Sequence, residues 1–538
     1  MKKRYLIFSA LILSVLLSCM DLTENPKASL TPGSYFNTPT EVNGVIAAMY
    51  RQLAKDGSWG FTSGFFPYFG GDDLACHPAS NKADQRSFDE LNGDSGNGSN
   101  GGIGPMWNAT WSGIYQANAI IANIGKVAYP TEDAMKADVG QAYFVRALAY
   151  FYATKTFGDV PIVIAIADAD ARPARSPILD VYTTVILPDL ALAETYLPDS
   201  WPGEPAKATK WAAKALLANV YMNMAGWPLN QADKYALAAS KANEVIQAGK
   251  FTLVPNYGDV FKTNFNSEAV FSLGYNTAGG LPRRSTGQFV IPDDETSEQG
   301  QAGWDDYCTE INFLKHAPAC QRTDETFLTK IKKRGTQNAD GTYNYNIIAW
   351  NDPNSETQHP YFKKFRYGVA APGTTVGDGC VETPTRLISM SPSTNKTLDL
   401  IRYPMVLLNF AEATARAGAV SADAYTAVNL VRNRAGLPNL TPGLSPTVFC
   451  DSVVFERAYE CAGEFGVRWF DIQRLQLLPK VIAARLVGSY PADKATGWEN
   501  PLNPKVFTDA AFLQSRYLAP IPIDEMNRNP QWTQNAFY

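Results

Sequence analysis

Helical periodicity dominates the first half of the chain. From Trp107 onward, large residues recur every three or four positions, which is the spacing of one helix face, and the segment 132–156 repeats this pattern. The second run ends at Gly158-Asp159-Val160-Pro161, where glycine followed by proline is typical of a helix end. The first run forms one apolar helical stripe, which comprises Trp107, Trp111, Ile114, Tyr115, Asn118 and Ile121. Further helices are predicted over 35–53, 178–196, 207–225 and 232–248.

Short connections between these segments predict antiparallel helical hairpins. The spacing Ala147-x-x-x-Phe151, followed by a helix-ending proline, is weakly similar to a tetratricopeptide unit. The consensus tryptophan and glycine of that repeat are misplaced here. The periodicity alone therefore predicts a generic stack of helix pairs.

The pattern changes after residue 250. Two short β-like runs occupy 251–254 and 269–273, and residues 276–399 show little helical periodicity. Glycine, proline, asparagine and aromatic residues dominate this long stretch, and such stretches inside compact proteins usually carry function. Helices are predicted again over 402–417, 422–435 and 446–464. The expected fold is therefore mainly α, with a loop-rich irregular half that contains short β-strands.

The N-terminus has the features of a bacterial lipoprotein signal. Lys2, Lys3 and Arg4 precede an apolar run that ends in Leu17-Ser18-Cys19. About a dozen apolar residues are too few to cross roughly 30 Å of hydrocarbon. We therefore expect cleavage before Cys19 and its lipidation, with more than one acyl chain giving a stable membrane anchor. Leu17 departs mildly from the small residue usual at that place.

These patterns divide the chain into five parts. They are a signal peptide (1–18), the lipidated cysteine and tether (19–34), a helical scaffold with an aromatic loop at 57–104 (35–275), an irregular ligand-loop region (276–400), and C-terminal helices with a closing segment (401–538).

Composition and charge narrow the functional classes. The 538 residues are 45% hydrophobic, 12% aromatic and 18% charged, which is typical of a globular protein rich in aromatics. Lysine and arginine total 47 against 52 acidic residues, and no basic block occurs. No nucleic-acid partner is predicted.

The cysteines and histidines offer little catalytic chemistry. Beyond Cys19, six cysteines permit fifteen pairings; a Cys308–Cys320 bridge is our best guess, and buried thiols are the alternative. There are three histidines and no C-x-x-C or H-E-x-x-H motif, so we predict neither a zinc site nor a cofactor.

Two patterns in the sequence are similar to catalytic sites. Gly93-Asp94-Ser95-Gly96, with His77 upstream, looks like the segment around a protease nucleophile, but its loop context lacks the scaffold that a triad needs. Among 52 acidic residues, pairs that could serve glycoside hydrolysis always exist, so their presence does not indicate a hydrolase. We predict no catalytic residue.

Several segments, taken in order, carry a resemblance. They are 107–118, Tyr143-Phe-Val-Arg-Ala-Leu-Ala-Tyr150 with Phe157-Gly-Asp-Val-Pro161, 212–227, 402–413, Val431-Arg-Asn-Arg-Ala-Gly436, 456–460 with 464–471, and Pro520-Ile-Pro-Ile-Asp-Glu525 with Asn529-Pro530 and Gln534-Asn535. Together they resemble the SusD/RagB family, lipid-anchored nutrient-binding proteins of the Bacteroidota outer membrane.

The resemblance implies a scaffold of about four tetratricopeptide-like helix pairs, with the ligand site in the loop-rich half. It also implies a partner, a SusC-like TonB-dependent transporter barrel that the lipoprotein covers as a hinged lid. Met20-Asp21-Leu22 is similar to the family's surface-export signal. The expected location is the cell-surface side of the outer membrane.

The recurrent charges of the C-terminal helices are interpreted as structural. Glu456, Glu460 and Glu464 follow one helix face near Arg457 and Arg468, and we expect an internal ion-pair network instead of an acid and base pair. The same interpretation covers Arg402, Glu412, Arg432 and Arg434. Trp107 and Trp111 are expected in the core.

Ligand candidates come from two loop stretches. A neutral sugar needs exposed aromatic faces beside polar groups that can pair with hydroxyls. The first stretch packs aromatics among glycines, which we expect to leave several rings facing solvent, and supplies Trp59, Phe65, Tyr68, Asp72 and Asp73. The second supplies Arg283, Trp304, Asp305, Tyr307, Tyr345 and Trp350, with Arg284, Asp306, Tyr343 and Tyr361 nearby. Local core packing is the alternative for each residue.

Trp304 and Tyr307 lead this set because polar neighbours flank them. Asp94 and Asn97 are a weak candidate pair for Ca²⁺ through their oxygens, and no other metal site is predicted.

The predicted function is non-enzymatic capture of an oligosaccharide or polysaccharide and its delivery to the transporter, without a cofactor. Three alternatives stay open: a binder of peptide or another nutrient, a lipid-anchored hydrolase, and a lid that touches no ligand. The paired charges Arg283-Arg284 and Asp305-Asp306 leave a peptide or an acidic glycan possible.

Overall fold

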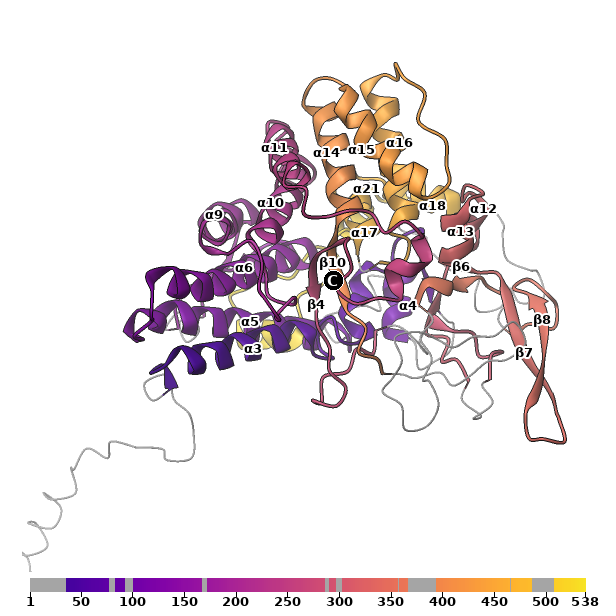
Figure 1. Ribbon diagram of the computed structural model, residues 1–538, viewed down its shortest axis with the longest axis horizontal. Helices are drawn as coiled ribbons and strands as arrows, with labels where there is room; N and C mark the ends of the chain where they lie inside the picture. The colour runs from indigo at the N-terminus through magenta and orange to yellow at the C-terminus, as the bar shows by residue number, and fades with distance from the viewer. Residues whose placement is uncertain are drawn as a thin grey trace, which may run out of the picture.

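A computed structural model describes residues 35–76, 83–91, 100–166, 172–285, 290–296, 302–356, 358–365, 393–464, 466–485 and 508–538. The predicted signal peptide, Cys19, the tether, the surface-export segment, His77, Asp94, Asn97 and Cys380 lie outside these residues. Figure 1 shows antiparallel helices along one side, a second group of helices above them, and strands at the opposite side.

The first group of helices forms the scaffold. Each helix packs against the next along the series α3, α5, α6, α9, α10 and α11, which confirms the predicted hairpins. Their bounds are α3 Pro39–Ala54, α5 Ile103–Asn123, α6 Glu132–Phe157, α9 Leu187–Tyr196, α10 Lys210–Ala225 and α11 Lys234–Gln247. Thr38, Thr131 and Thr209 cap α3, α6 and α10 by accepting a backbone N–H of the first turn. Gly158, with φ of 76°, ends α6 as predicted.

The second group continues the stack. Helix α14 packs against α11 and against α15 and α16. These helices and the closing ones are α14 Tyr403–Ala417, α15 Ala422–Arg434, α16 Pro446–Glu460, α17 Val467–Arg474, α18 Leu478–Arg485, α21 Ala510–Ser515 and α22 Ile523–Arg528. Ser421 and Ser445 cap α15 and α16. The single helix predicted over 446–464 ends at Glu460.

Two details of the first half differ from the sequence patterns. The helix predicted over 178–196 contains a π-helical turn, η4 Tyr182–Ile186, between α8 Ile178–Val181 and α9. The β-like run at 251–254 forms no strand, whereas 269–273 does: β4 Ala269–Leu273 pairs antiparallel with β10 Leu398–Arg402.

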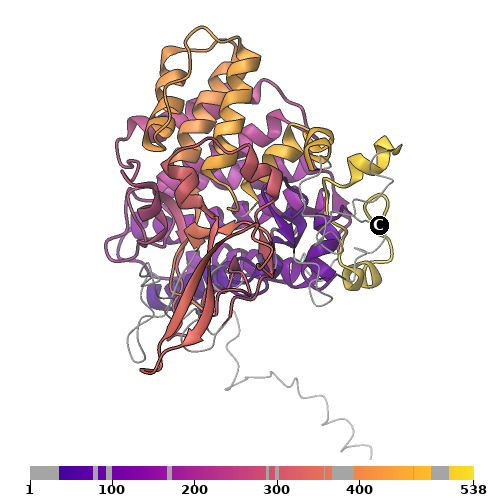
Figure 2. The same cartoon turned by 90° about the vertical axis from the view of Figure 1, so that its right-hand side faces the viewer.

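The region 276–400 combines loops with short strands and helices. It contains the hairpin β7 Lys330–Gln337 and β8 Tyr343–Ala349, which projects from the body in Figures 1 and 2. The turn between them includes Gly341 at φ of 86°, which glycine tolerates. Also present are β5 Tyr307–Cys308, paired with β1 Ala75–Cys76, α12 Ile311–Lys315, α13 Gln321–Thr326, and β6 Phe327–Leu328, paired with β9 Tyr361–Phe362. Between these elements the described residues form loops, which agrees with the prediction of a loop-rich half that contains short β-strands.

The remaining elements are short. They are η1 Thr62–Tyr68, α4 Ala83–Asp89, η3 Ile124–Lys126, β2 Val160–Pro161 paired with β3 Arg175–Ser176, η5 Tyr257–Phe261 and η7 Lys363–Phe365.

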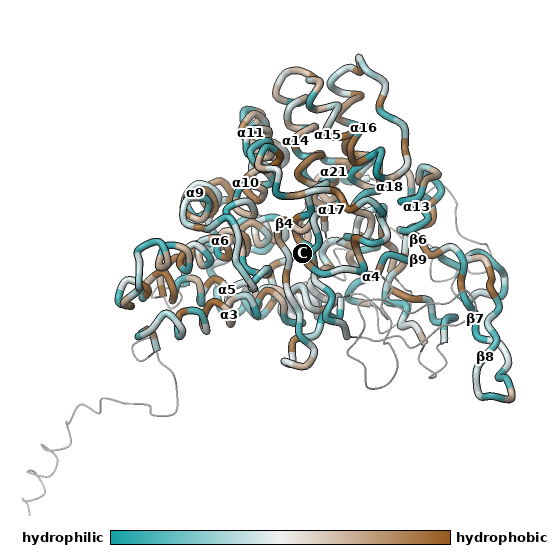
Figure 3. The backbone as a smooth tube through the Cα atoms, in the orientation of Figure 1, coloured by the Kyte–Doolittle hydropathy of each residue, from teal (hydrophilic) through white to brown (hydrophobic). Residues whose placement is uncertain are grey.

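One hydrophobic core extends from α3 through the scaffold to α17 and the closing segment. Figure 3 shows hydrophobic segments inside the helical stack and a largely hydrophilic hairpin β7–β8. Across the residues described, none of the helices combines the length and the hydropathy that a bilayer crossing requires. The prediction of a mainly α fold with short strands is confirmed.

Candidate ligand-binding site

The aromatic loop at 59–73 packs into the core. Trp59, Phe65 and Tyr68 are 5%, 4% and 2% exposed. Trp59 meets Tyr152 edge to face at 4.8 Å between ring centroids, and the Tyr68 hydroxyl lies 3.0 Å from Thr156 Oγ1. The prediction that these rings face solvent is wrong.

The glycines of this loop explain the error. A Cβ on Gly64 would lie 1.9 Å from the carbonyl oxygen of Ser58, so glycine permits a close backbone approach that lets the loop fold inward. The loop then forms η1, which packs against α4 and α5.

The two carboxylates after this loop fix it to the C-terminal helices. Asp72 forms a bidentate pair with Arg468, with both N–O distances 2.6 Å. Asp73 accepts the backbone N–H of Gly463 at 2.9 Å. Burial and the neighbouring Asp72 raise the pKa of Asp73 to about 6. Both carboxylates were predicted as ligand contacts. Asp73 is instead buried, and Asp72, although it lines a pocket of about 310 Å³, is paired with Arg468.

The paired arginines of the second stretch also serve the fold. Arg283 is buried and donates from Nη1 to the carbonyl oxygen of Thr397 at 2.5 Å. Arg284 pairs with Asp56 at 2.8 Å, and its guanidinium lies 5.0 Å from the Phe61 ring centroid. The burial of Arg283 therefore argues against a contact with a charged ligand.

Asp305 and Tyr307 face inward on either side of Asp306. Asp305, 2% exposed, accepts a hydrogen bond from the buried Tyr361 hydroxyl. Tyr307 is 3% exposed, and its hydroxyl donates to the Ser285 carbonyl oxygen at 2.8 Å. The prediction of exposed rings at Tyr307 and Tyr361 is wrong, because their hydroxyls bind internal acceptors. These side chains act as anchors of the segment.

Trp304, unlike Asp305 and Tyr307, faces solvent. Its side chain is 43% exposed, while the adjacent Asp305 is buried. A Cβ on Gly303 would lie 2.1 Å from the Ile291 carbonyl oxygen, so this loop approaches 290–296 more closely than any other residue type allows. The Asp305 N–H donates to that same oxygen at 3.1 Å. We call Trp304 and its supporting residues 291–296 and 303–305 the Trp304 platform.

The projecting hairpin is attached to the same support. Tyr345 of β8 is half-buried, packs against Ile291, and donates its hydroxyl to the Thr296 carbonyl oxygen at 3.1 Å. Lys332 of β7 donates its backbone N–H to Glu295 at 2.8 Å. Trp350, at the end of β8, is half-buried, and Arg334 covers the ring of Tyr343 at 3.4 Å. The structure thus attaches Trp304 and Tyr345 to the same support. The first aromatic loop meets the second stretch inside the core, where the rings of Phe69 and Tyr307 lie 5.3 Å apart.

The predicted disulfide does not form. Cys308 and Cys320 are both thiols. Cys308 lies in β5 opposite Ala75, with Sγ 3.6 Å from the Ala75 carbonyl oxygen, whereas Cys320 caps α13 with Sγ 3.5 Å from Thr323 Oγ1. Among the described cysteines the alternative holds, namely free thiols.

The ion-pair network predicted for the C-terminal helices is confirmed. Arg402 is fully buried and binds Glu268 at 2.8 Å, Glu460 at 3.0 Å and Glu464 at 2.8 Å. Arg434 also pairs with Glu268 and Glu460. We call this group, with Arg322, the Arg402 cluster. Burial alone would raise the pKa of Glu460, but the three arginines hold it at about 2.

A second buried group surrounds Glu412. Arg457 binds it at 2.8 Å, Arg474 at 2.6 Å and Arg416 at 2.7 Å. These guanidiniums outweigh the effect of burial and lower the pKa of Glu412 far below its usual range. Both groups bind the helices together, and neither exposes a carboxylate with the raised pKa of a catalytic acid. In the described part of the chain, no three His, Cys, Asp or Glu side chains gather as a metal site.

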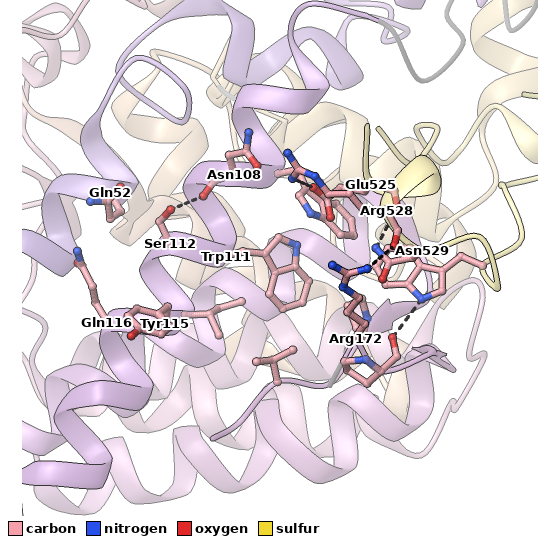
Figure 4. Close-up of a pocket in the computed structure, with 16 residues that line it drawn as sticks. Gln52, Asn108, Trp111, Ser112, Tyr115, Gln116, Arg172, Glu525, Arg528 and Asn529 are labelled. Carbon is pink, nitrogen blue, oxygen red and sulfur yellow. Dashed lines mark hydrogen bonds and ion pairs between the residues drawn. The ribbon is translucent and has the colours of Figure 1, made fainter. Parts of the chain in front are cut away.

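A large pocket lies away from the predicted loops. It has a volume of about 690 Å³ and is lined by α5, by Pro161, Val163 and Pro173, and by residues 525–532 (Figure 4). We call it the α5 cleft. Trp111 packs against the core and also lines the cleft, and Tyr115 of the same helical stripe is 43% exposed there. Successive steps of four advance 40° beyond a full helical turn. Tyr115 is therefore rotated about 80° from Trp107, a drift that the sequence already showed.

Comparison with known proteins identifies the family. The sequence family described as "SusD family" matches residues 283–538, and one described as "Starch-binding associating with outer membrane" matches 23–222. SusD-like protein P2 of Formosa agariphila is 28% identical over 557 residues, covering 99% of both chains.

Solved structures share the fold, with its tetratricopeptide-like scaffold. A SusD homolog from Bacteroides thetaiotaomicron has a TM-score of 0.76 at 21% identity, covering 94% of this chain and 98% of its own. Surface glycan-binding protein A from the same organism, solved in complex with laminarihexaose, has a TM-score of 0.68 at 20% identity, covering 93% and 100%. The chain belongs to the SusD/RagB family.

Proposed function

We propose that this protein is a cell-surface glycan-binding lipoprotein. Lipid on Cys19 anchors it to the outer membrane, and it passes a captured oligosaccharide or polysaccharide to a SusC-like TonB-dependent transporter. Membership of the family supports this role, as does the fold shared with a surface glycan-binding protein that binds laminarihexaose. The observation that carries the proposal is the exposed ring of Trp304 on an anchored loop.

The Trp304 platform has the physical properties of a sugar site. An indole face stacks on the C–H face of a pyranose ring and needs no charge. Because Gly303 and Asp305 fix the backbone on both sides of the ring, little conformational entropy is lost when a sugar docks. Tyr345 and Trp350 of the hairpin are the proposed additional contacts. One principal ring predicts modest affinity for short oligosaccharides and stronger retention of a polymer with repeated units.

A neutral glycan fits better than a peptide or an acidic glycan. The arginines and aspartates that left those ligands open are engaged inside the protein: Arg283 with Thr397, Arg284 with Asp56, and Asp305 with Tyr361. Hydrolysis is not proposed, because the buried glutamates of the Arg402 cluster are neutralised by arginines.

Native affinity electrophoresis of the chain starting after Cys19 tests the proposal. Gels contain plant, microbial and host polysaccharides. We expect retardation by one neutral glycan that is markedly weaker in Trp304→Ala. Phe455→Ala is the matched control, because Phe455 is 46% exposed on α16 and lies outside the platform. Equal retardation of wild type and Trp304→Ala contradicts the assignment of the site.

A lid that touches no ligand predicts no retardation by any glycan in the panel. Release of reducing sugar by the purified protein would instead support the hydrolase alternative.

A further inference from the structure

The α5 cleft lies apart from the Trp304 platform. Figure 1 places α5 and the hairpin β7–β8, to which the platform is attached, at opposite sides of the molecule. The cleft volume of about 690 Å³ is within the roughly 300–1,000 Å³ typical of small-molecule sites. A ligand here would not share contacts with Trp304, which does not line the cleft.

A rigid aromatic surface forms one wall of the cleft. Trp111 is fixed by Trp107, with ring centroids 5.3 Å apart, and meets Tyr150 edge to face at 5.5 Å. Trp532 closes the far side, where its indole N–H donates to the Pro173 carbonyl oxygen at 3.1 Å. Because these contacts hold Trp111 in place, stacking a flat ligand on it costs little side-chain entropy.

Tyr115 extends this wall by one helical turn. Residues four apart on a helix are neighbours, so Trp111 and Tyr115 offer two successive aromatic faces. Tyr115 is 43% exposed. Within the described residues its hydroxyl makes no hydrogen bond. The apolar face of an exposed aromatic ring contacts water unfavourably. A ligand that covers this face removes the contact.

Neutral polar side chains border the two rings. Asn108, Ser112 and Gln116 come from the same helix as the rings, and Gln52 comes from α3 (Figure 4). The Gln116 carbonyl oxygen accepts no hydrogen bond from a described residue, so its amide can turn toward a ligand without breaking a bond in the protein. Amide groups both donate and accept, as sugar hydroxyls do.

The charges at the opposite rim engage protein groups. Arg528 pairs with Glu525 at 2.7 Å, and Arg172 donates to the Arg528 carbonyl oxygen at 3.3 Å (Figure 4). The aromatic wall is thus bordered by amides, while the charged groups lie at the C-terminal side. This arrangement favours an uncharged ligand with a flat apolar face and several hydroxyls.

We propose that the α5 cleft is a second carbohydrate site, which stacks neutral hexose units on Trp111 and Tyr115 and binds their hydroxyls through Gln116. The site does not depend on the Trp304 platform. Two sites on one chain increase retention of a long polysaccharide when both engage the same polymer.

Isothermal titration of the chain starting after Cys19 with laminarihexaose, cellohexaose and maltohexaose tests the inference. We expect Trp304→Ala to retain one binding event with one of these neutral oligosaccharides. In Trp304→Ala, adding Tyr115→Ala should weaken that event about tenfold or more, as loss of an aromatic anchor does. Gln116→Ala should weaken it as well. Adding Leu237→Ala, which removes a 42% exposed side chain from α11, should leave it unchanged.

The outcomes separate the two sites. Absence of binding by Trp304→Ala to all three oligosaccharides overturns the second site, as does binding that is indifferent to Tyr115→Ala and Gln116→Ala. Binding that depends on Tyr115 but not on Trp304 supports the cleft and contradicts the Trp304 assignment. Because Tyr115 is exposed, Tyr115→Ala should keep the wild-type melting temperature, and a circular dichroism melt confirms that each variant is folded.

Discussion

Replacing Glu460 by glutamine removes one negative charge from the Arg402 cluster and nearly preserves the shape of the side chain. Glu460 is fully buried and contacts Arg402, Arg434 and Arg322, which are also buried. Breaking a buried ion pair at one partner costs about 3–5 kcal/mol, because the remaining charge stays in a medium of low polarity. Domains unfold with about 5–15 kcal/mol, so the loss is a large part of the total.

The pKa of Glu460 gives a second route to this magnitude. The folded state lowers it from 4.5 to about 2. At about 1.4 kcal/mol per pKa unit, this shift corresponds to about 3 kcal/mol of stability. Because the folded-state pKa is depressed, the contribution is fully present above pH 4.5 and is lost as the pH falls toward 2.

Urea unfolding, followed by circular dichroism and tryptophan fluorescence, measures the effect. We expect Glu460→Gln to unfold with about 3–5 kcal/mol less free energy at pH 7, and the gap to shrink at pH 3. Glu325→Gln is the control: Glu325 pairs with Lys363 at 3.1 Å near the surface, and we expect a loss under about 1 kcal/mol. A loss under about 1 kcal/mol for Glu460→Gln at pH 7 would refute the structural role of the cluster.

Three further predictions concern the loops. Because burial raises the folded-state pKa of Asp73 to about 6, the stability of the wild type relative to Asp73→Asn, measured by urea unfolding, should fall by about 3 kcal/mol as the pH rises from 4 to 7; a constant difference between the two proteins would contradict this. Gly303→Ala should push the loop from Ile291 and weaken glycan retardation, whereas Gly104→Ala, with no atom within 4 Å of the new Cβ, should not; unchanged retardation of Gly303→Ala would contradict the platform geometry. Alkylation of unreduced, denatured protein should label both Cys308 and Cys320, and a tryptic peptide pair linked through them would contradict the structure.

The helices were the most predictable part of the fold, since local periodicity and caps determine them. Thr131 and Gly158 bound α6 as the sequence indicates. The π-helical turn at Tyr182–Ile186 was not predicted from the apolar pattern. The hairpin β7–β8 was not predicted. Polar residues cover its exposed faces, so its strands lack a clear apolar pattern.

Exposure of the loop aromatics could not be read from the sequence, because the partners that bury them lie far along the chain. Tyr68 bonds Thr156, and Asp72 pairs with Arg468, 396 residues away. Polar residues flank both Trp304 and Tyr307 in the sequence, yet Trp304 is exposed and Tyr307 is buried. Trp304 is exposed whereas the next three residues are buried, and only the docking of the segment on the rest of the protein decides which side chains turn inward.

The charge clusters were recognisable from sequence because three glutamates repeat at helical spacing among arginines. Their partner Glu268, just before β4, was not identified, since nothing local links it to Arg402. The α5 cleft was missed for a related reason: a stripe of aromatics at steps of four drifts around the helix, and its last ring leaves the core.

Hydroxyl-radical footprinting of Trp304, read by mass spectrometry, tests the proposed function most directly. At 43% exposure, Trp304 should oxidise readily in the unliganded protein, whereas Trp107, 3% exposed, serves as the internal reference. The account predicts that the glycan that retards the protein lowers Trp304 oxidation severalfold and leaves Trp107 unchanged. Equal oxidation of Trp304 with and without saturating glycan would contradict the claim that this ring holds the ligand.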